Sequence, residues 1–275
     1  MKPYKIHDLL RLPFGRLLFS RDKGESMSSS AMFFQSHLSA AHVRGGESIR
    51  SYDLGSGLVT NVGVLSMAAD FLYADVSGVG NSTLDMSNWH FTGTGVTAAA
   101  ATDYKIQTIS ANGGQTPVAG TQTLVSAANL QKYQTVATIA YTGTEAVTEW
   151  GLITSGTVSS TTGSPFTAGS ATTGTVTGTP LTASSTTVAG QQLTIFVNTN
   201  ASRLSWGLVT SNTTSVITVP AWYKNADGTA GTLPVNADAY TIRPIMWDHK
   251  VFAAINVLNG DSIIFTYLLT ISSGG

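Results

Sequence analysis

The chain has 275 residues, of which only 11% are charged, and its formal net charge is −1. A nucleic-acid-binding protein needs a basic surface that displaces counterions, so this charge balance argues against nucleic acid as a partner. The chain contains no cysteine, which excludes disulfides, thiolate metal sites and a cysteine nucleophile. The length accommodates one large domain or two modest ones with a substantial core. Low surface charge favours a protein that hides much of its surface against partners.

Residues 1–26 are the one locally basic segment and carry six of the chain's 14 basic side chains. Asp8, Arg11, Pro13 and Arg16 interrupt its apolar runs, so we expect neither a secretory signal nor a membrane span. We expect an extended or partly helical arm that docks on a neighbouring subunit, and the alternative is a frayed tail. The expected contact residues of this arm are Leu9, Leu10, Arg11, Leu12, Phe14, Arg16, Leu17, Leu18 and Phe19.

Residues 28–57 combine a short helix-like stretch with a glycine-rich link. We therefore assign residues 1–57 to an N-terminal arm and linker. Met27 is an alternative start to Met1, and an intact-mass measurement would decide between them.

From residue 58 onward, short runs rich in β-branched and aromatic residues alternate with turn residues. The sequence TVATIAY places Ala137, Ile139 and Tyr141 on one face of a predicted strand. Further strands are expected at 146–153, 192–198, 215–222 and 239–247, and a turn is expected at 225–229. Because helical periodicity is scarce, we predict an all-β chain built as an antiparallel β-sandwich of jelly-roll or immunoglobulin-like type.

The C-terminal region predicts a β-hairpin across residues 251–271. Asn259-Gly260 supplies the positive φ angles that a tight turn needs. In the strand that follows, one predicted face is formed by Ile263, Phe265, Tyr267, Leu269 and Ile271. Ile264 and Leu268 fall on the other face, which predicts a central strand covered on both sides.

Two features indicate an inserted unit between residues 156 and 245. The segment TEWGLITSG at 148–156 matches LSWGLVTSN at 204–212, which indicates two similar strand–turn units. Residues 150–202 contain no charge, and we favour ordered β-structure at a subunit contact over a solvated linker. We expect the sandwich to comprise 58–155 and 246–275, with 156–245 as an inserted Thr/Ser/Gly-rich β-lobe.

The glycine-rich stretch Gly93-Thr94-Gly95 raises the question of a phosphate-binding loop. It has no third glycine at the spacing of a dinucleotide site, and the nearest lysine, Lys105, is too distant for a Walker loop. The sequence also has no G-x-S-x-G and no H-E-x-x-H motif. We therefore predict no enzymatic activity and no cofactor.

The histidines and acidic residues give no metal site by spacing. Only His37 and His42 approach each other in sequence, and structural roles are favoured for all five histidines. Asp248-His249 lacks a nucleophile, so a capped strand end is preferred to acid–base chemistry. The turn at 225–229 lacks the acidic ligands of a calcium loop. No metal is expected.

Three segments, taken in order, resemble a module that is widespread in structural proteins of tailed bacteriophages. These segments are 91–108, 134–154 and 250–271. The matching residues are Gly93, Thr94, Gly95, Thr97 and Asp103, then Glu149, Gly151 and Leu152, then Gly260, Asp261, Ser262, Ile263, Phe265, Tyr267, Leu269 and Ile271. The resemblance covers about 84–155 and 246–275. The chain departs from it at Tyr104-Lys105-Ile106 and in the long insertion of 156–245.

The resemblance implies a β-sandwich without catalytic residues in a decoration, fibre or tail-associated protein. We expect a non-enzymatic virion structural protein, with a capsid cement or decoration role favoured over a tail or fibre role. Its location would be the virion, assembled in the bacterial cytoplasm, and its partners would be the major capsid protein or other virion subunits. The uncharged stretch 150–202 favours a homo-oligomer, with a trimer preferred.

The alternative from another class is a carbohydrate-binding module that recognises a host surface. Sugar rings stack on exposed aromatic side chains, and the candidates are Trp206, Trp222, Tyr223 and Trp247. Core packing is the competing explanation for the same four residues.

Overall fold

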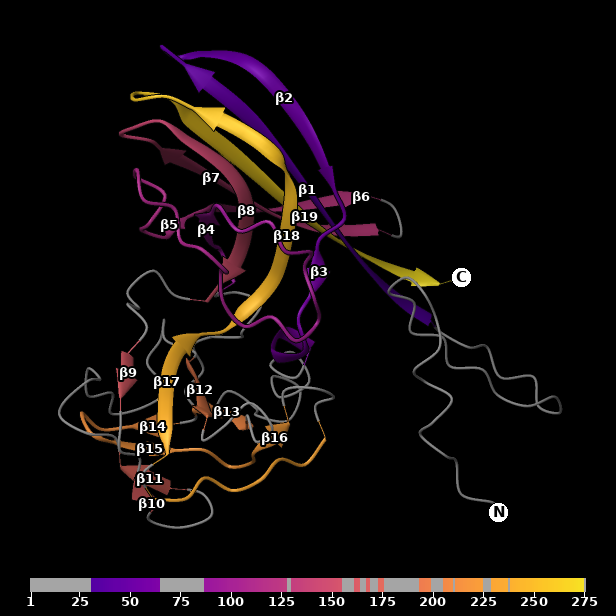
Figure 1. The fold of residues 1–275 in the computed structure, drawn as a ribbon. Helices are drawn as coiled ribbons and strands as arrows, with labels where there is room; N and C mark the ends of the chain where they lie inside the picture. Colours follow the sequence, from indigo (N-terminus) through magenta and orange to yellow (C-terminus); the bar gives the residue numbers. More distant parts are fainter. Residues whose placement is uncertain are drawn as a thin grey trace, which may run out of the picture.

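The computed structural model describes residues 31–64, 87–127, 130–154, 161–163, 167–168, 173–175, 193–198, 205–209, 211–224, 229–236 and 238–274. The described strands form four antiparallel sheets arranged in two lobes, and Figure 1 shows one lobe above the other. The predicted all-β, antiparallel sandwich is confirmed. No helix among the described residues is long and apolar enough to span a membrane.

The first lobe is a sandwich of two five-stranded sheets, A and B. Sheet A has the order β2-β1-β19-β7-β6 and sheet B the order β3-β18-β8-β4-β5. The strands of sheet A are β1 (Ala31–Arg44), β2 (Glu47–Gly55), β6 (Thr121–Ala127), β7 (Leu130–Ala140) and β19 (Ser262–Gly274). The strands of sheet B are β3 (Leu58–Val59), β4 (Trp89–Gly93), β5 (Val118–Ala119), β8 (Glu145–Ile153) and β18 (Met246–Val257).

The core of this lobe lies between the two sheets. Alternate residues of each strand point inward, as the period of two requires. The predicted inward residues Ala137, Ile139 and Tyr141 of β7 are buried, which confirms that face. On β19 the predicted face is also buried at Ile263, Phe265, Tyr267 and Leu269. Ile264 and Leu268, on the opposite face, are only half-buried, so β19 is central in its sheet but is not fully covered on both sides.

The assignment of 31–57 to an arm and linker is wrong, because β1 and β2 occupy most of it. β1 pairs with β19 over thirteen residues, from Ala31↔Gly274 to Val43↔Ser262. Gly45 and Gly46 join β1 to β2 with φ angles of 58° and 87°, the conformation of a two-residue hairpin turn. The Ala- and Ser-rich composition of β1 has weak strand propensity, so pairing with β19 rather than local preference determines its structure.

The predicted C-terminal hairpin is also wrong, although its turn exists. Gly260 has a φ of 86°, as the turn requires. The two flanking strands enter different sheets, because β18 pairs with β8 and β3 whereas β19 pairs with β1 and β7. Turn chemistry fixes a reversal of the chain but not the partner of each strand. Here the reversal carries the chain from one side of the core to the other.

The second lobe contains sheets C and D. Sheet C has the order β16-β13-β12-β17-β9, and sheet D has the order β10-β11-β15-β14. The strands of sheet C are β9 (Thr161–Gly163), β12 (Leu193–Asn198), β13 (Ser205–Val209), β16 (Tyr223–Lys224) and β17 (Ala239–Pro244). The strands of sheet D are β10 (Thr167–Ala168), β11 (Thr173–Thr175), β14 (Ser211–Asn212) and β15 (Val216–Thr218). The uncharged run therefore holds ordered strands at its described positions.

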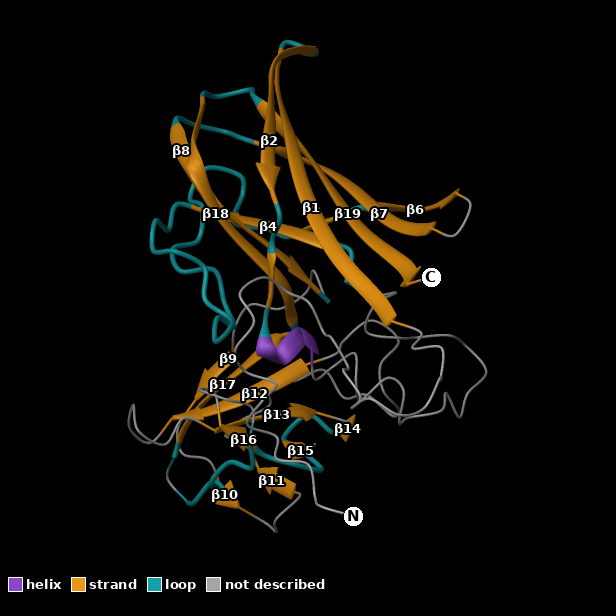
Figure 2. Cartoon of the chain, turned by 90° about the vertical axis from the view of Figure 1, so that its right-hand side faces the viewer, coloured by secondary structure: helices purple, strands orange, loops and turns teal. Residues whose placement is uncertain are grey.

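The two lobes meet through a small apolar cluster. Val62, in a single helical turn at 61–64, packs there with Phe196, Trp206 and Ile245. The helical turn lies between the lobes in Figure 2. Tyr104 of the first lobe stacks on Phe196 of the second, with ring centroids 4.1 Å apart.

Candidate functional site

The loop at 94–108 follows β4 and packs against β8, where it contacts Thr148 and Glu149. Its ends are held together by the Gly93↔Ile109 bridge and by a Thr94 N–H that donates to the Thr108 carbonyl at 2.8 Å. Gly95 is needed by contact rather than by φ, because a Cβ there would lie 2.4 Å from the Glu149 carboxylate. Gly93-Thr94-Gly95, which is part of the resemblance, therefore allows this loop to lie close to β8.

Glu149 holds this loop through backbone donors. Its side chain is fully buried and accepts hydrogen bonds from the N–H groups of Gly95 at 3.0 Å, Gln107 at 2.6 Å and Thr108 at 3.3 Å. A phosphate-binding loop would direct such N–H groups at a ligand. In this protein a carboxylate of the chain itself occupies them.

His249 joins Glu149 to the far end of the loop. Its Nε2 lies 2.9 Å from Glu149 Oε1, and its Nδ1 lies 2.7 Å from Asp103 Oδ2. Asp103 also accepts the Ala100 N–H at 2.7 Å. We call Asp103, Glu149 and His249 the clamp. The capped strand end expected at Asp248-His249 is thus replaced by a histidine between two carboxylates.

The electrostatics of the clamp favour a charged histidine. Burial alone would lower the pKa of His249, but the hydrogen bonds to Glu149 and Asp103 outweigh burial and raise that pKa above its ordinary value. With a proton on each ring nitrogen, His249 donates to both carboxylates. A base needs a free ring nitrogen facing a substrate, and both nitrogens here are engaged by protein. The arrangement therefore suits fixing the loop.

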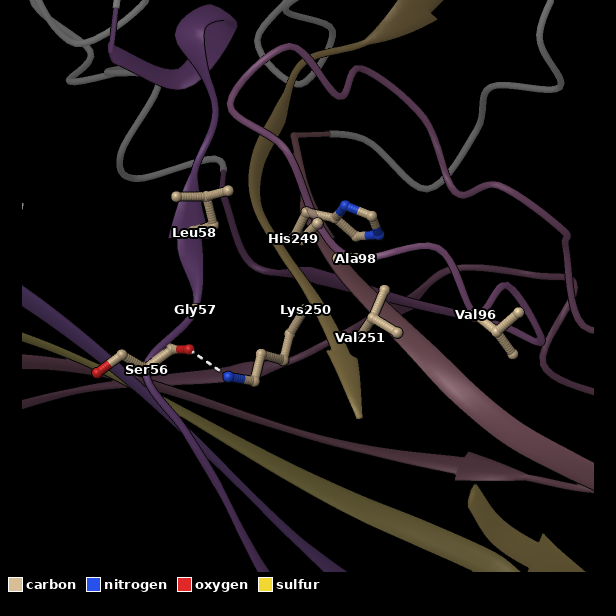
Figure 3. A pocket seen from close by; sticks show the side chains of 9 residues that line it. Ser56, Gly57, Leu58, Val96, Ala98, His249, Lys250 and Val251 are labelled. Atoms are coloured by element: carbon tan, nitrogen blue, oxygen red, sulfur yellow. Dashed lines mark hydrogen bonds between the residues drawn. The ribbon is translucent and has the colours of Figure 1, made fainter. Parts of the chain in front are cut away.

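An open surface hollow of about 390 Å³ lies beside the clamp. Figure 3 shows the residues that line it, from β3 and the chain just before it, β18 and the 94–108 loop. Lys250 donates from Nζ to the Ser56 carbonyl at 2.6 Å, so its ammonium ties the chain before β3 to β18. Val96, which is 77% exposed, forms part of its apolar wall.

A second polar group lies inside the sandwich core. Trp247 donates from Nε1 to the Tyr267 hydroxyl at 3.0 Å, and that hydroxyl donates to Asp248 Oδ2 at 3.2 Å. Neighbouring residues of a regular strand point to opposite faces, and an irregularity between Met246 and Asp248 lets both reach Tyr267. Burial raises the pKa of Asp248 to about 6. Its Oδ1 has no hydrogen-bond partner among the described residues.

A third polar group braces the turn between β18 and β19. Asp261 is buried and accepts hydrogen bonds from Arg44 Nε and Nη2, each at 2.7 Å, and from the Leu258 N–H at 2.9 Å. His42 Nε2 lies 2.8 Å from the same carboxylate. The hydrogen bonds from Arg44 hold the pKa of Asp261 well below its usual range. This group ties the turn to β1.

The two remaining described histidines are also bound by protein groups. His37 lies 2.9 Å from Asp53 on the neighbouring strand. His90 accepts the Trp150 Nε1–H at Nδ1, 3.1 Å away, and burial lowers its pKa to about 3, which keeps the ring neutral. These contacts agree with the structural roles expected for histidine. Within the described residues, no group of three His, Asp or Glu side chains has the arrangement of a metal site.

The interpretation of the tryptophans as exposed glycan-stacking residues is wrong. Trp206 and Trp247 are 0% and 2% exposed, and Trp222 is 8% exposed. Tyr223 is half-buried and packs beside Trp206, with ring centroids 5.2 Å apart. These rings fill the interior of the two lobes because each buries a large apolar area there.

Other sequence expectations fall outside the described residues. The expected arm contacts at 9–19 and His7 lie in the first 30 residues, which the structure does not describe. Most of the expected turn at 225–229 also lies outside them. These expectations stay predictions.

The sequence identified Asp103, Glu149 and Asp261 through the resemblance but missed their partners. His249 is 100 residues from Glu149 and 146 from Asp103, and His42 is 219 residues from Asp261. No local pattern links residues at such separations. Comparison of the chain with protein-family models, with curated proteins and with solved structures gave no match.

Proposed function

We propose that the protein is a non-enzymatic structural subunit of a tailed-bacteriophage virion. A capsid cement or decoration role is preferred, and a tail- or fibre-associated role is the second candidate. The subunit would work as a homo-oligomer in contact with the major capsid protein or other virion subunits.

One observation carries the proposal: acidic residues of the matching segments serve the protein's own backbone. Glu149 accepts three backbone N–H groups, Asp103 accepts one, and Asp261 accepts one together with the Arg44 guanidinium. A carboxylate saturated in this way rigidifies a loop, whereas an acid–base catalyst keeps an oxygen directed at substrate. The pattern that carries the resemblance is thus a scaffold pattern.

The surface composition supports the same role. Large apolar side chains are exposed in both lobes, among them Leu124 at 69% and Leu233 at 51%. With so few charges on the chain, such surface is more stable against other subunits than against water. A carbohydrate-binding role receives no such support, since three of its four candidate rings are buried.

Quantitative mass spectrometry of purified virions tests the proposal. The expected result is a fixed copy number of this chain per particle that survives washing at high salt. Detection only at trace level, in particles whose capsid and tail proteins are all quantified, would overturn it.

The sequence-based arm prediction gives a second test. Deletion of residues 1–26 should leave the melting temperature unchanged and abolish incorporation into particles, because the arm's apolar residues would bury against a shell subunit. Full incorporation of the truncated chain contradicts the anchor. Failure of the truncated chain to fold would assign the arm to the protein's own core.

A further inference from the structure

The two edges of sheet A differ in charge. β2 forms one edge and carries Glu47, Arg50 and Asp53. β6 forms the other edge, and its sequence TQTLVSA contains no charged residue. Charged side chains on an edge strand discourage pairing with other chains. The β2 edge is therefore protected in this way and the β6 edge is not.

The β6 edge is also long. β6 pairs with β7 from Thr121↔Val136 to Ala127↔Leu130. No strand in the described part of the chain pairs with its other side. By comparison, the edge strands of sheet B, β3 and β5, are two residues each. An edge strand of seven residues is long enough to pair with another extended strand.

Leu124 marks the face on which this edge is incomplete. Residues paired across two strands share a face of the sheet, and Leu124 pairs with Tyr133, two positions from the fully buried Thr135. Leu124 therefore belongs to the face that forms the core elsewhere in sheet A, yet it is 69% exposed. Figures 1 and 2 show that β6 projects beyond the strands of sheet B.

We propose that β6 pairs antiparallel with β6 of a second copy of this chain, so that sheet A continues across two subunits. Antiparallel pairing of a strand with its own copy is symmetric about a two-fold axis perpendicular to the sheet. That axis leaves both Leu124 side chains on the same face, where each covers apolar surface of the other subunit. No like charges meet, because β6 has none.

The inference rests on the proposed role as a self-assembling subunit and specifies one contact of it. A two-fold contact builds assemblies with an even number of subunits, unlike the trimer that the composition favoured. The mass of the assembly therefore distinguishes this two-fold contact from a trimer, and cross-linking gives the position of the contact.

Because the chain has no cysteine, a disulfide in a single-cysteine variant can form only at the introduced position. Single variants Thr123→Cys, Leu124→Cys and Val125→Cys would be oxidised at micromolar concentration, with Leu233→Cys as the control. Leu233 is a 51% exposed leucine of the second lobe. Opposed residues of an antiparallel pair lie within about 4.5–5.5 Å at Cα, inside the range of a disulfide. We expect at least one β6 position to form disulfide dimers tenfold or more faster than the control. Equal rates at all four positions would overturn the proposal.

Analytical ultracentrifugation gives an independent readout. Leu124→Lys should weaken self-association at least about tenfold, because it places a charge where two apolar side chains meet. Leu233→Lys should not change it. If Leu124→Lys fails to fold, amide exchange of the unaltered chain replaces it: the amides of 123–127 should exchange more slowly at high protein concentration than at low. Concentration-independent exchange, or an unaltered chain that stays monomeric at tens of micromolar, contradicts the proposal.

Particle incorporation separates this inference from the proposed function. If the chain is monomeric in solution but is present at fixed copy number in virions, the β6 contact is contradicted and the proposed function is supported. If the chain forms a β6-linked dimer but is absent from virions, the contact is supported and the proposed function is contradicted.

Discussion

The two lobes are stabilised in different ways although both are antiparallel β-structures. The sandwich surrounds its apolar core with ionic groups that have buried carboxylates, the clamp and the Arg44–Asp261 pair, which fix its loops. In the described part of the second lobe, packing relies on aromatic and aliphatic side chains, such as Trp206 beside Tyr223. Charged networks hold chain segments in one position, whereas apolar packing tolerates rearrangement. This difference indicates that the sandwich is the lobe with the more precisely fixed geometry.

Each lobe also contains a strand with the sequence Trp-Gly-Leu, so that the same residues can be compared in two surroundings. Trp150-Gly151-Leu152 lies in β8 and Trp206-Gly207-Leu208 lies in β13. Both tryptophans are 0% exposed. Trp150 Nε1 donates to His90, whereas Trp206 Nε1 has no partner among the described residues. The same three residues are thus used with a polar contact in one lobe and without one in the other.

The largest effect is expected from removing the centre of the clamp. Glu149→Ala leaves three backbone N–H groups without their acceptor and a buried histidine with one carboxylate. Breaking a buried ionic group by removing one partner costs about 3–5 kcal/mol. Chemical denaturation measures the loss, with Glu47→Ala on the exposed β2 edge as a control within about 0.5 kcal/mol of the unaltered chain. If Glu149→Ala loses less than about 1 kcal/mol, the clamp does not stabilise the sandwich as we expect.

The pH dependence of stability tests the buried Asp248. Its pKa is raised to about 6, so the folded protein binds a proton more tightly than the unfolded chain. Its favourable contribution is present below the ordinary carboxyl pKa and is lost as pH rises to about 6. The free energy of unfolding of Asp248→Asn, measured relative to that of the unaltered chain, should therefore rise by on the order of 3 kcal/mol between pH 3 and pH 7. A stability difference that is flat across this range contradicts the assignment.

The matched tryptophans test the contrast between the lobes directly. Trp150→Phe leaves His90 Nδ1 without its donor, whereas Trp206→Phe removes a donor that had no partner. Both variants lose similar packing volume, so Trp150→Phe should cost about 1–3 kcal/mol more. Equal losses in thermal denaturation would show that the polar contact contributes nothing.

The matched glycines give the smallest effect. A Cβ at Gly207 would lie 2.2 Å from Val219 Cγ1 and 2.8 Å from the Ala221 carbonyl, so backbone must move. A Cβ at Gly151 would meet the ends of Ile106 and Met246 at 3.1 and 3.2 Å, which shift more easily. Gly207→Ala should cost about 1–3 kcal/mol and Gly151→Ala less than about 1 kcal/mol. The reverse order would mean that Val219 and the backbone at Ala221 give way more easily than the side chains of Ile106 and Met246.

Local sequence patterns predicted the strands in which apolar and polar residues alternate strongly. They failed where pairing with a distant strand determines the structure. The inward face of β19 followed from Ile263, Phe265 and Tyr267, because a period of two needs no knowledge of partners. β1 was missed, since its alanines and serines become a strand only beside β19. The sheet of β18 was missed because a turn at Gly260 reverses the chain without choosing its neighbour.

The candidate site was predicted only in its acidic half. Asp103, Glu149 and Asp261 stood in the matching segments, but His249 and His42 approach them through the fold alone. Their burial and their contacts with these carboxylates arise from sheet pairing across more than 100 residues of chain. Single-sequence reasoning therefore favoured structural roles for the histidines without finding the groups that they contact.

The central claim is that this chain is a structural subunit of a virion, and cryo-electron microscopy of intact particles tests it most directly. The expected result is two-lobed density, with the sandwich of sheets A and B, repeated at symmetry-related positions on the capsid surface or along the tail. Particles resolved to side-chain detail, in which other chains account for all protein density, would contradict it.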